Sequence, residues 1–133
     1  MSIAITQGVH HVGLTVSELE QSASFFVNTL GWEEVRRIDD YPAIFVSDGT
    51  VMLTLWKTRD TPATDFNKDR NVGLHHIALM VESEDALMQV HNRLIQHEIA
   101  IEFAPEFLRD GPAKHMMCIE PSGIRVEFIW LGV

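Results

Sequence analysis

The chain has 133 residues and a formal net charge of −9, with 10 lysines and arginines against 19 aspartates and glutamates. This acidic balance argues against binding to nucleic-acid phosphates, and no apolar run is long enough to span a bilayer. The first residues lack the basic and apolar regions of a secretory signal. The single cysteine, Cys118, cannot form an internal disulfide, so we expect a cytoplasmic protein. With 46% hydrophobic residues the chain can bury one core, which predicts a single domain over 1–133.

The first half of the chain is predicted to form one strand, one helix and three further strands. Alternating apolar residues predict the first strand over 9–16. Ser17 stands three residues before Glu20, the spacing of a capping box, and Gly31 fits the end of the helix that would begin there. The strands that follow are predicted over 32–38, 42–47 and 50–57, with a tight turn at Asp48-Gly49.

The second half repeats this order after a polar linker. Residues 59–71 contain Pro62 and separate a first module, about 8–58, from a second, about 72–133. The second module is predicted to have a helix over 83–98 and strands over 74–82, 99–104, 114–120 and 124–131. The fold class is therefore α+β, with two tandem βαβββ modules.

Two matches between the halves indicate a duplicated unit. The sequence His-His-Val-Gly-Leu-Thr-Val at 10–16 returns as His-His-Ile-Ala-Leu-Met-Val at 75–81. Ser-Asp-Gly at 47–49 returns as Pro-Ser-Gly at 121–123, and in each half an apolar strand ending in tryptophan follows. Self-similarity of this kind is the signature of a repeated supersecondary unit.

Strand alternation places three potential metal ligands on faces that no helix covers. Side chains along a strand point to opposite faces in turn, and the all-apolar row of each strand is expected to pack on the helix of its own module. The opposite row then carries His11 in the first module and His76 and Glu127 in the second. His10 and His75 face away and are interpreted as residues that support the fold or the ligands.

Two imidazoles and one carboxylate are the donor set of a facial triad, which binds Fe(II), Mn(II), Ni(II) or Zn(II) and leaves positions open for substrate. Each residue alone has a simpler explanation, since a lone strand histidine is usually packed or at the surface and a terminal glutamate is usually solvated. The coincidence of a matching histidine in both modules with a glutamate on the same row favours a metal site.

The chain resembles the vicinal oxygen chelate superfamily over about 9–131, on the paired His-x-x-Leu-x-Val openings, the glycine turns and Arg125-Val126-Glu127-Phe128. That family includes glyoxalase I, fosfomycin-resistance enzymes, extradiol dioxygenases, methylmalonyl-CoA epimerase and bleomycin-binding proteins. The resemblance implies a cup of paired modules around a divalent metal ion. His11, His76 and Glu127 fall on its ligand positions, and Glu127 is also the expected catalytic carboxylate.

The chain departs from the glyoxalase I pattern at one ligand position. Aligning Gly49 with Gly123 puts Leu53 where glyoxalase I commonly has a further acidic ligand. Fosfomycin-resistance enzymes expect a hydroxyl at the position of Gly13, and an extradiol dioxygenase needs a nearby acid or base, for which His115 and Tyr41 are candidates.

Two arginines are candidates for binding an anionic substrate. Arg109 lies in the longer loop of the second module and is equally well explained as part of a solvated turn. Arg125 shares the face of Glu127, where it could bind a carboxylate or phosphate or pair with a neighbouring acid.

The leading functional hypothesis is a metal-dependent enzyme that chelates a small oxygen-bearing substrate, most simply a glyoxalase-like lyase or isomerase. The alternatives are an extradiol-type dioxygenase, a thiol transferase of the fosfomycin-resistance type, and a non-catalytic protein that binds an antibiotic or similar small molecule. For that last case the expected lining of the groove includes Leu53 and Leu55. The family resemblance further implies a homodimer.

Overall fold

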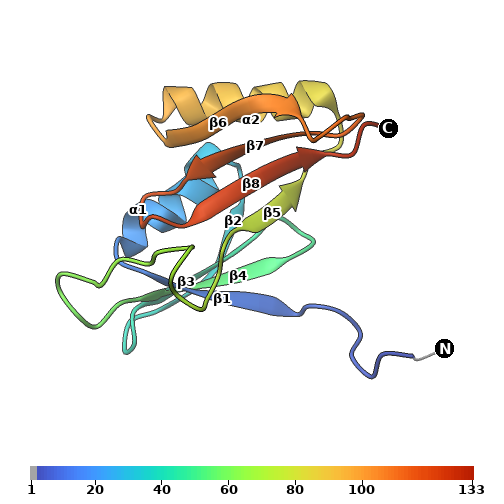
Figure 1. The fold of residues 1–133 in the computed structure, drawn as a ribbon. Coiled ribbons are helices and arrows are strands. Elements are labelled where there is room, and N and C mark those ends of the chain that lie inside the picture. The colour runs from blue at the N-terminus through green and yellow to red at the C-terminus, as the bar shows by residue number, and fades with distance from the viewer. Residues whose placement is uncertain (1–2) are drawn as a thin grey trace. The chain divides into compact units, whose positions relative to one another are not determined.

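The computed structural model describes residues 3–133 and divides into two compact units, unit 1 at Met1–Arg59 and unit 2 at Asp60–Val133. Each unit has one four-stranded mixed sheet (Figure 1). The chain is therefore an α+β protein of two βαβββ units, and the fold class predicted from the sequence is confirmed. Within residues 3–133, no helix is long and apolar enough to cross a membrane.

Unit 1 has the strand order β1-β4-β3-β2, with β1 parallel to β4 and the other neighbours antiparallel. Its helix α1 continues directly into η1, a turn of π-helix, and Gly31 follows with a positive φ of 82°. Glycine adopts that conformation without steric cost, which explains why the helix ends there. The elements are β1 (His11–Val16), α1 (Leu19–Ser24), η1 (Phe25–Thr29), β2 (Glu33–Ile38), β3 (Ala43–Ser47) and β4 (Met52–Lys57).

The core of unit 1 lies between its sheet and its helix. Alternate residues of β1 are buried and exposed, as the sequence predicts for a strand with one packed face. Because α1 packs on β3 and β4, the buried row of each strand is the row beneath the helix. Its fully or nearly fully buried members are Leu14, Val16, Ile44, Val46, Leu53 and Leu55.

Unit 2 repeats this arrangement with the strand order β5-β8-β7-β6. In Figure 1 its helix α2 runs over the sheet, and α2 contacts β6, β7 and β8. The elements are β5 (Ile77–Met80), α2 (Glu84–Gln96), β6 (Ala100–Phe107), β7 (Lys114–Ile119) and β8 (Arg125–Trp130).

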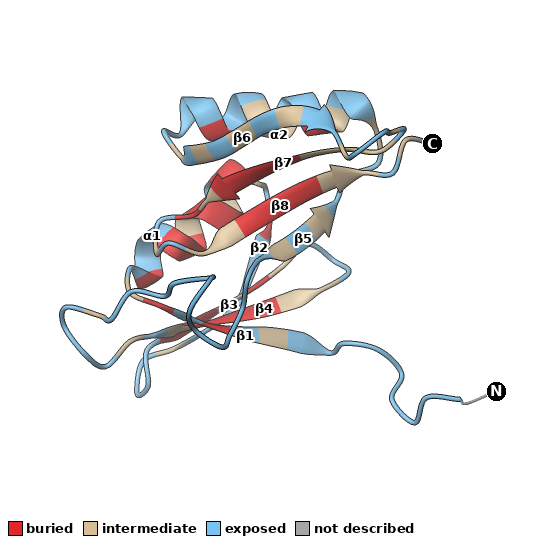
Figure 2. Ribbon diagram, in the orientation of Figure 1, coloured by how far each residue is buried: buried red, intermediate tan, exposed pale blue. Residues whose placement is uncertain are grey.

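The core of unit 2 includes the single cysteine. Figure 2 shows buried residues along the middle of β7 and β8, and Cys118 is completely buried there beside Met116 and Met117. Burial raises the pKa of the Cys118 thiol to about 12, because the thiolate would lose its hydration and lie near Glu120. Cys118 is therefore a packing residue that stays protonated at neutral pH.

The two helices begin differently, and the capping box predicted at Ser17 is wrong. The N-cap position of α1 falls on Glu18, so Ser17 lies before the helix. In α2 the N-cap is Ser83, whose side chain accepts a 2.9 Å hydrogen bond from the backbone N–H of Ala86. The capping-box spacing favoured Ser17, which has Glu20 three residues later, whereas Ser83 has Ala86 at that place and still caps its helix.

This difference predicts unequal effects of removing the two hydroxyls. Ser83→Ala is expected to lower the free energy of unfolding by about 1 kcal/mol, since an N–H of the first turn loses its partner. Ser17→Ala serves as the matched control, with an expected change within about 0.5 kcal/mol. Urea unfolding followed by circular dichroism measures both, and equal losses in the two variants would contradict the assignment of the caps.

Candidate metal centre

Two of the three predicted ligands meet in unit 2. The parallel pairing of β5 with β8 sets Ala78 opposite Glu127, and His76 directly precedes β5 on the same side of the sheet. The His76 Nε2 atom lies 3.2 Å from Oε1 of Glu127. An imidazole nitrogen and a carboxylate oxygen thus converge on one point, and both are donor types that first-row transition metals accept.

Glu127 is held in place by a second histidine. Glu127 is only 9% exposed, and its Oε2 atom lies 2.6 Å from Nδ1 of His115. Because a carboxylate only accepts hydrogen bonds, His115 donates through Nδ1. The His115 ring packs against Phe103 at a centroid distance of 4.8 Å, and its Nε2 lies 3.9 Å from the Glu106 carboxylate. His115, which the sequence offered as a candidate acid or base, therefore orients the carboxylate.

His11, the third predicted ligand, opens β1 in unit 1. It is exposed, on the row of Gly13 and Thr15 that α1 does not cover. Within residues 3–133, no group of three or more His, Cys, Asp or Glu side chains is gathered as a metal site. The structure brings His76 and Glu127 together, and these two residues fit a metal by donor type.

The prediction that Leu53 corresponds to Glu127 in the first half is wrong. The sheet registers pair Gly13 with Thr54 and Ala78 with Glu127, so Thr54 is the residue that corresponds to Glu127. Leu53 instead pairs with Val12 and is completely buried under the helix. The same parity corrects the expected groove lining, because Leu53 and Leu55 both face the core of unit 1.

Thr54 belongs to a packed aromatic cluster on the helix-free face of unit 1. Its hydroxyl accepts a 2.9 Å hydrogen bond from Trp56 Nε1. A Cβ atom at Gly13 would lie 3.2 Å from that hydroxyl, so glycine leaves room for it. Tyr41 packs edge-on against Trp56 at 5.2 Å, with the Arg59 guanidinium 4.4 Å above the Tyr41 ring. Tyr41 is thus placed in unit 1, among aromatic side chains.

The two candidate arginines have different surroundings. Arg125 forms two hydrogen bonds with Glu102, from Nε at 2.9 Å and from a terminal nitrogen at 2.7 Å. These bonds hold the pKa of Glu102 below its ordinary value and raise that of Arg125. Arg125 therefore pairs with a neighbouring acid, one of the two alternatives the sequence allowed. Arg109 lies in the loop after β6 with a positive φ of 56°.

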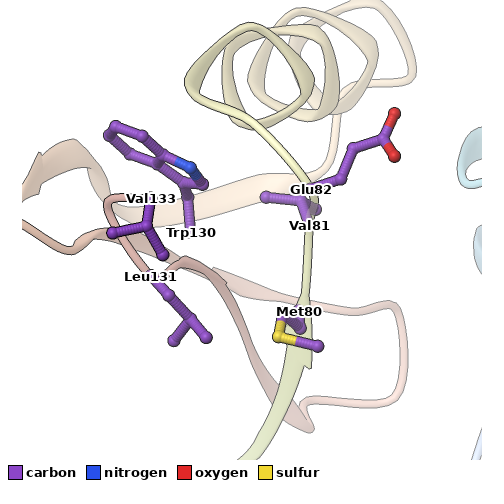
Figure 3. A pocket seen from close by; sticks show the side chains of 6 residues that line it. All are labelled: Met80, Val81, Glu82, Trp130, Leu131 and Val133. Carbon is purple, nitrogen blue, oxygen red and sulfur yellow. The ribbon is translucent and has the colours of Figure 1, made fainter.

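A hollow of about 240 Å³ opens at the ends of β5 and β8 in unit 2 (Figure 3). Its walls are mainly apolar, and Figure 3 shows the Glu82 carboxylate directed away from the Trp130 ring. None of the three predicted ligands lines it, so this hollow does not identify a reactive centre. The lining residues are Met80, Val81, Glu82, Trp130, Leu131 and Val133.

Two βαβββ units, each with a histidine at or directly before the start of its first strand, define a protein of the vicinal oxygen chelate class. The model of the glyoxalase/bleomycin resistance protein/dioxygenase superfamily matches residues 8–128. The chain belongs to this superfamily.

Three relatives illustrate the range of the family. A catechol-2,3-dioxygenase of Bacillus subtilis is 30% identical over 95 residues, which are 68% of this chain but only 32% of the dioxygenase. A glyoxylase/bleomycin resistance protein/dioxygenase domain from Frankia sp. EAN1pec superimposes with a TM-score of 0.80 at 28% identity, covering 94% of this chain and 98% of the other. A lactoylglutathione lyase from Agrobacterium tumefaciens shares the fold, with a TM-score of 0.74, 19% identity and 96% of each chain covered.

Proposed function

We propose that the chain is a divalent-metal-dependent enzyme that binds a small oxygen-bearing substrate through two oxygens, with His11, His76 and Glu127 as metal ligands. The observation that carries the proposal is the 3.2 Å approach of His76 Nε2 to Glu127 Oε1. Both atoms can donate an electron pair, and at this separation both can bind one divalent cation. His11 would supply the third donor, from the same chain or from a second copy of it.

The residues of unit 2 prepare the carboxylate for this role. The His115 N–H binds one oxygen of Glu127 and leaves the other directed at His76. Fixing the rotation of a ligand before binding lowers the entropy lost when the metal arrives. A bound divalent ion supplies Lewis-acid stabilisation of negative charge that develops on a substrate oxygen.

A glyoxalase-like lyase or isomerase is the reaction class we favour. Such a reaction moves a proton next to the chelating oxygens, and the Glu127 carboxylate is the group that would accept and return it. Because Thr54 stands at the matching position of unit 1, a transfer between two paired carboxylates is not part of the proposal. The proton would leave and return through Glu127 on one face of the substrate.

A second candidate is an extradiol-type dioxygenase. It is favoured by the 30% identity to a protein named catechol-2,3-dioxygenase, although the alignment spans about a third of that protein. In this reaction the His115–Glu127 pair would orient the ligand in the same way, and a catechol would supply the two chelating oxygens.

Metal analysis of protein purified without chelators tests the proposal and separates the candidates. We expect a stoichiometric divalent metal in the wild type that His76→Ala loses. Iron would favour oxygen chemistry, tested by oxygen uptake with catechol, whereas nickel or zinc would favour isomerase chemistry, tested with a 2-oxoaldehyde–thiol adduct. A wild type that holds no metal and gains none on titration with Fe(II), Mn(II), Ni(II) and Zn(II) would overturn the enzyme proposal and favour a non-catalytic binding protein.

We propose a homodimer as the functional form. Sedimentation velocity at micromolar concentration measures the oligomeric state, and a monomer that still binds the metal would show that a single chain completes the site.

A further inference from the structure

Each predicted ligand histidine touches the histidine that precedes it. His75 Nδ1 lies 2.8 Å from His76 Nδ1, and His10 Nδ1 lies 2.9 Å from His11 Nδ1. The rings of both pairs meet edge to face, with centroids 5.0 and 5.1 Å apart. A neutral imidazole carries its hydrogen on one nitrogen, so one Nδ1 of each pair donates and the other accepts.

In unit 2 an arginine determines which ring donates. A terminal nitrogen of Arg125 lies 3.1 Å from His75 Nδ1 and 3.2 Å from the His75 carbonyl oxygen. A guanidinium only donates hydrogen bonds, so His75 Nδ1 must accept. The hydrogen between the two rings therefore sits on His76 Nδ1. Neutral His76 then has a bare electron pair on Nε2, the nitrogen that faces Glu127.

The arginine is itself held rigidly. Glu102 accepts two hydrogen bonds from Arg125 in a fork, and the Arg125 side chain is only 15% exposed. Paired hydrogen bonds of this kind fix the plane of the guanidinium as well as its position. A contiguous chain of contacts thus runs from Glu102 through Arg125 and His75 to His76.

Unit 1 has the histidine pair without the arginine. Met52 pairs with His11 on β4 and corresponds to Arg125 on β8. A thioether has no hydrogen to donate, so Met52 cannot force His10 Nδ1 to accept.

We propose that Arg125 and His75 are positioning residues that lock His76 as the Nδ1-protonated tautomer and so present its Nε2 for ligation. The proposal rests on the proposed function of His76 as a metal ligand, but the tautomer itself is a property of the metal-free chain. Outer contacts that set the tautomer of a ligating histidine commonly change metal affinity by about 10–100-fold.

The experiment is long-range ¹H–¹⁵N NMR of the histidine side chains at pH 8, on metal-free wild type, Arg125→Met and Arg37→Met. The control Arg37 is also an arginine bound by carboxylates, those of Glu20 and Glu34. In wild type and Arg37→Met we expect His76 as the Nδ1–H form and His75 as the Nε2–H form. Arg125→Met should shift His76 toward the Nε2–H form that neutral histidine favours in water. Should that variant fail to fold, Arg125→Lys, which keeps a charged donor without the fork, replaces it.

Titration with Zn²⁺ alone provides the second readout. Arg125→Met is expected to weaken Zn²⁺ binding about 10-fold, with Arg37→Met unchanged. Wild-type His76 in the Nε2–H form, or an unchanged tautomer in Arg125→Met, would overturn the inference even if Zn²⁺ binds. Conversely, a locked tautomer in a protein that binds neither Zn²⁺ nor the other metals would uphold the lock and reject the proposed function.

Discussion

Replacing Glu127 with glutamine is expected to weaken divalent metal binding by about 100-fold or more, equivalent to roughly 2.7 kcal/mol. The amide keeps the size of the side chain and still accepts the hydrogen bond from His115, but it brings no negative charge to the metal. Isothermal titration with Mn²⁺ or Zn²⁺ measures the affinity. Thermal unfolding gives a second readout, because a ligand at 100 times its Kd stabilises the wild type by about 2.7 kcal/mol.

Glu106→Gln is the matched control for this prediction. This substitution removes the carboxylate charge that lies 3.9 Å from Nε2 of His115. The Glu106 side chain is 59% exposed. Solvent screens such a charge, so the metal affinity should change by less than about 5-fold. Equal losses in the two variants would show that bulk charge, and not ligation by Glu127, holds the metal.

A carboxylate introduced at Leu53 is expected to destabilise the protein strongly, whereas one introduced at Thr54 is expected to cost less. Leu53 is completely buried beneath the helix of unit 1, so Leu53→Glu places an unpaired charge in an apolar core. The expected loss is about 4 kcal/mol or more. Thr54 is also buried, but it lies on the opposite face, where Trp56 Nε1 already donates to its side chain. Thr54→Glu keeps an acceptor for that N–H but overpacks the site, and should cost about 2–3 kcal/mol.

Thermal denaturation measures the difference, with an expected fall in Tm of roughly 10–20 °C for Leu53→Glu. Leu53→Met, which keeps an apolar side chain of similar volume, is the control and should cost less than about 1.5 kcal/mol. A stable Leu53→Glu variant that gains metal affinity would restore the alignment based on glycine and contradict the sheet register.

Strand alternation carried most of what the sequence could predict. The buried row of β1 and the pairing of Ala78 with Glu127 confirm that His11, His76 and Glu127 lie on rows opposite the helices. This succeeded because each strand has one apolar row, and that row fixes the orientation of every other residue.

The prediction of Leu53 as the equivalent of Glu127 in unit 1 failed, and strand alternation also explains this error. The hairpin of unit 1 spans residues 48–51 between paired Ser47 and Met52, whereas that of unit 2 spans 120–124 between Ile119 and Arg125. The glycines occupy different places in these two turns, so aligning them shifts the strands by one residue. A one-residue shift exchanges the two faces of the strand, so the alignment identified Leu53 instead of Thr54 as the equivalent of Glu127.

The contacts of the supporting residues could not be predicted from the sequence, because they depend on strand order. Glu102 lies on β6 and His115 on β7, and their contacts with Arg125 and Glu127 follow from the order β5-β8-β7-β6. Sequence alternation identifies the face of a residue but not its neighbour on the next strand. The available signals were His115, a candidate acid or base, Arg125, a candidate partner for a neighbouring acid, and the adjacent histidine pairs that begin at His10 and His75.

β1, which begins with His11, and β5, which directly follows His76, are both edge strands of their sheets. An edge strand has a hydrogen-bonded neighbour on one side only, so a substitution there disturbs the backbone hydrogen bonds to one neighbouring strand. In unit 2 the buried residues of the sheet lie on β7 and β8, and none lies on β5. Residues carried at or beside an edge strand can be exchanged over evolution at little cost to folding, which suits a superfamily named for glyoxalases, bleomycin resistance proteins and dioxygenases.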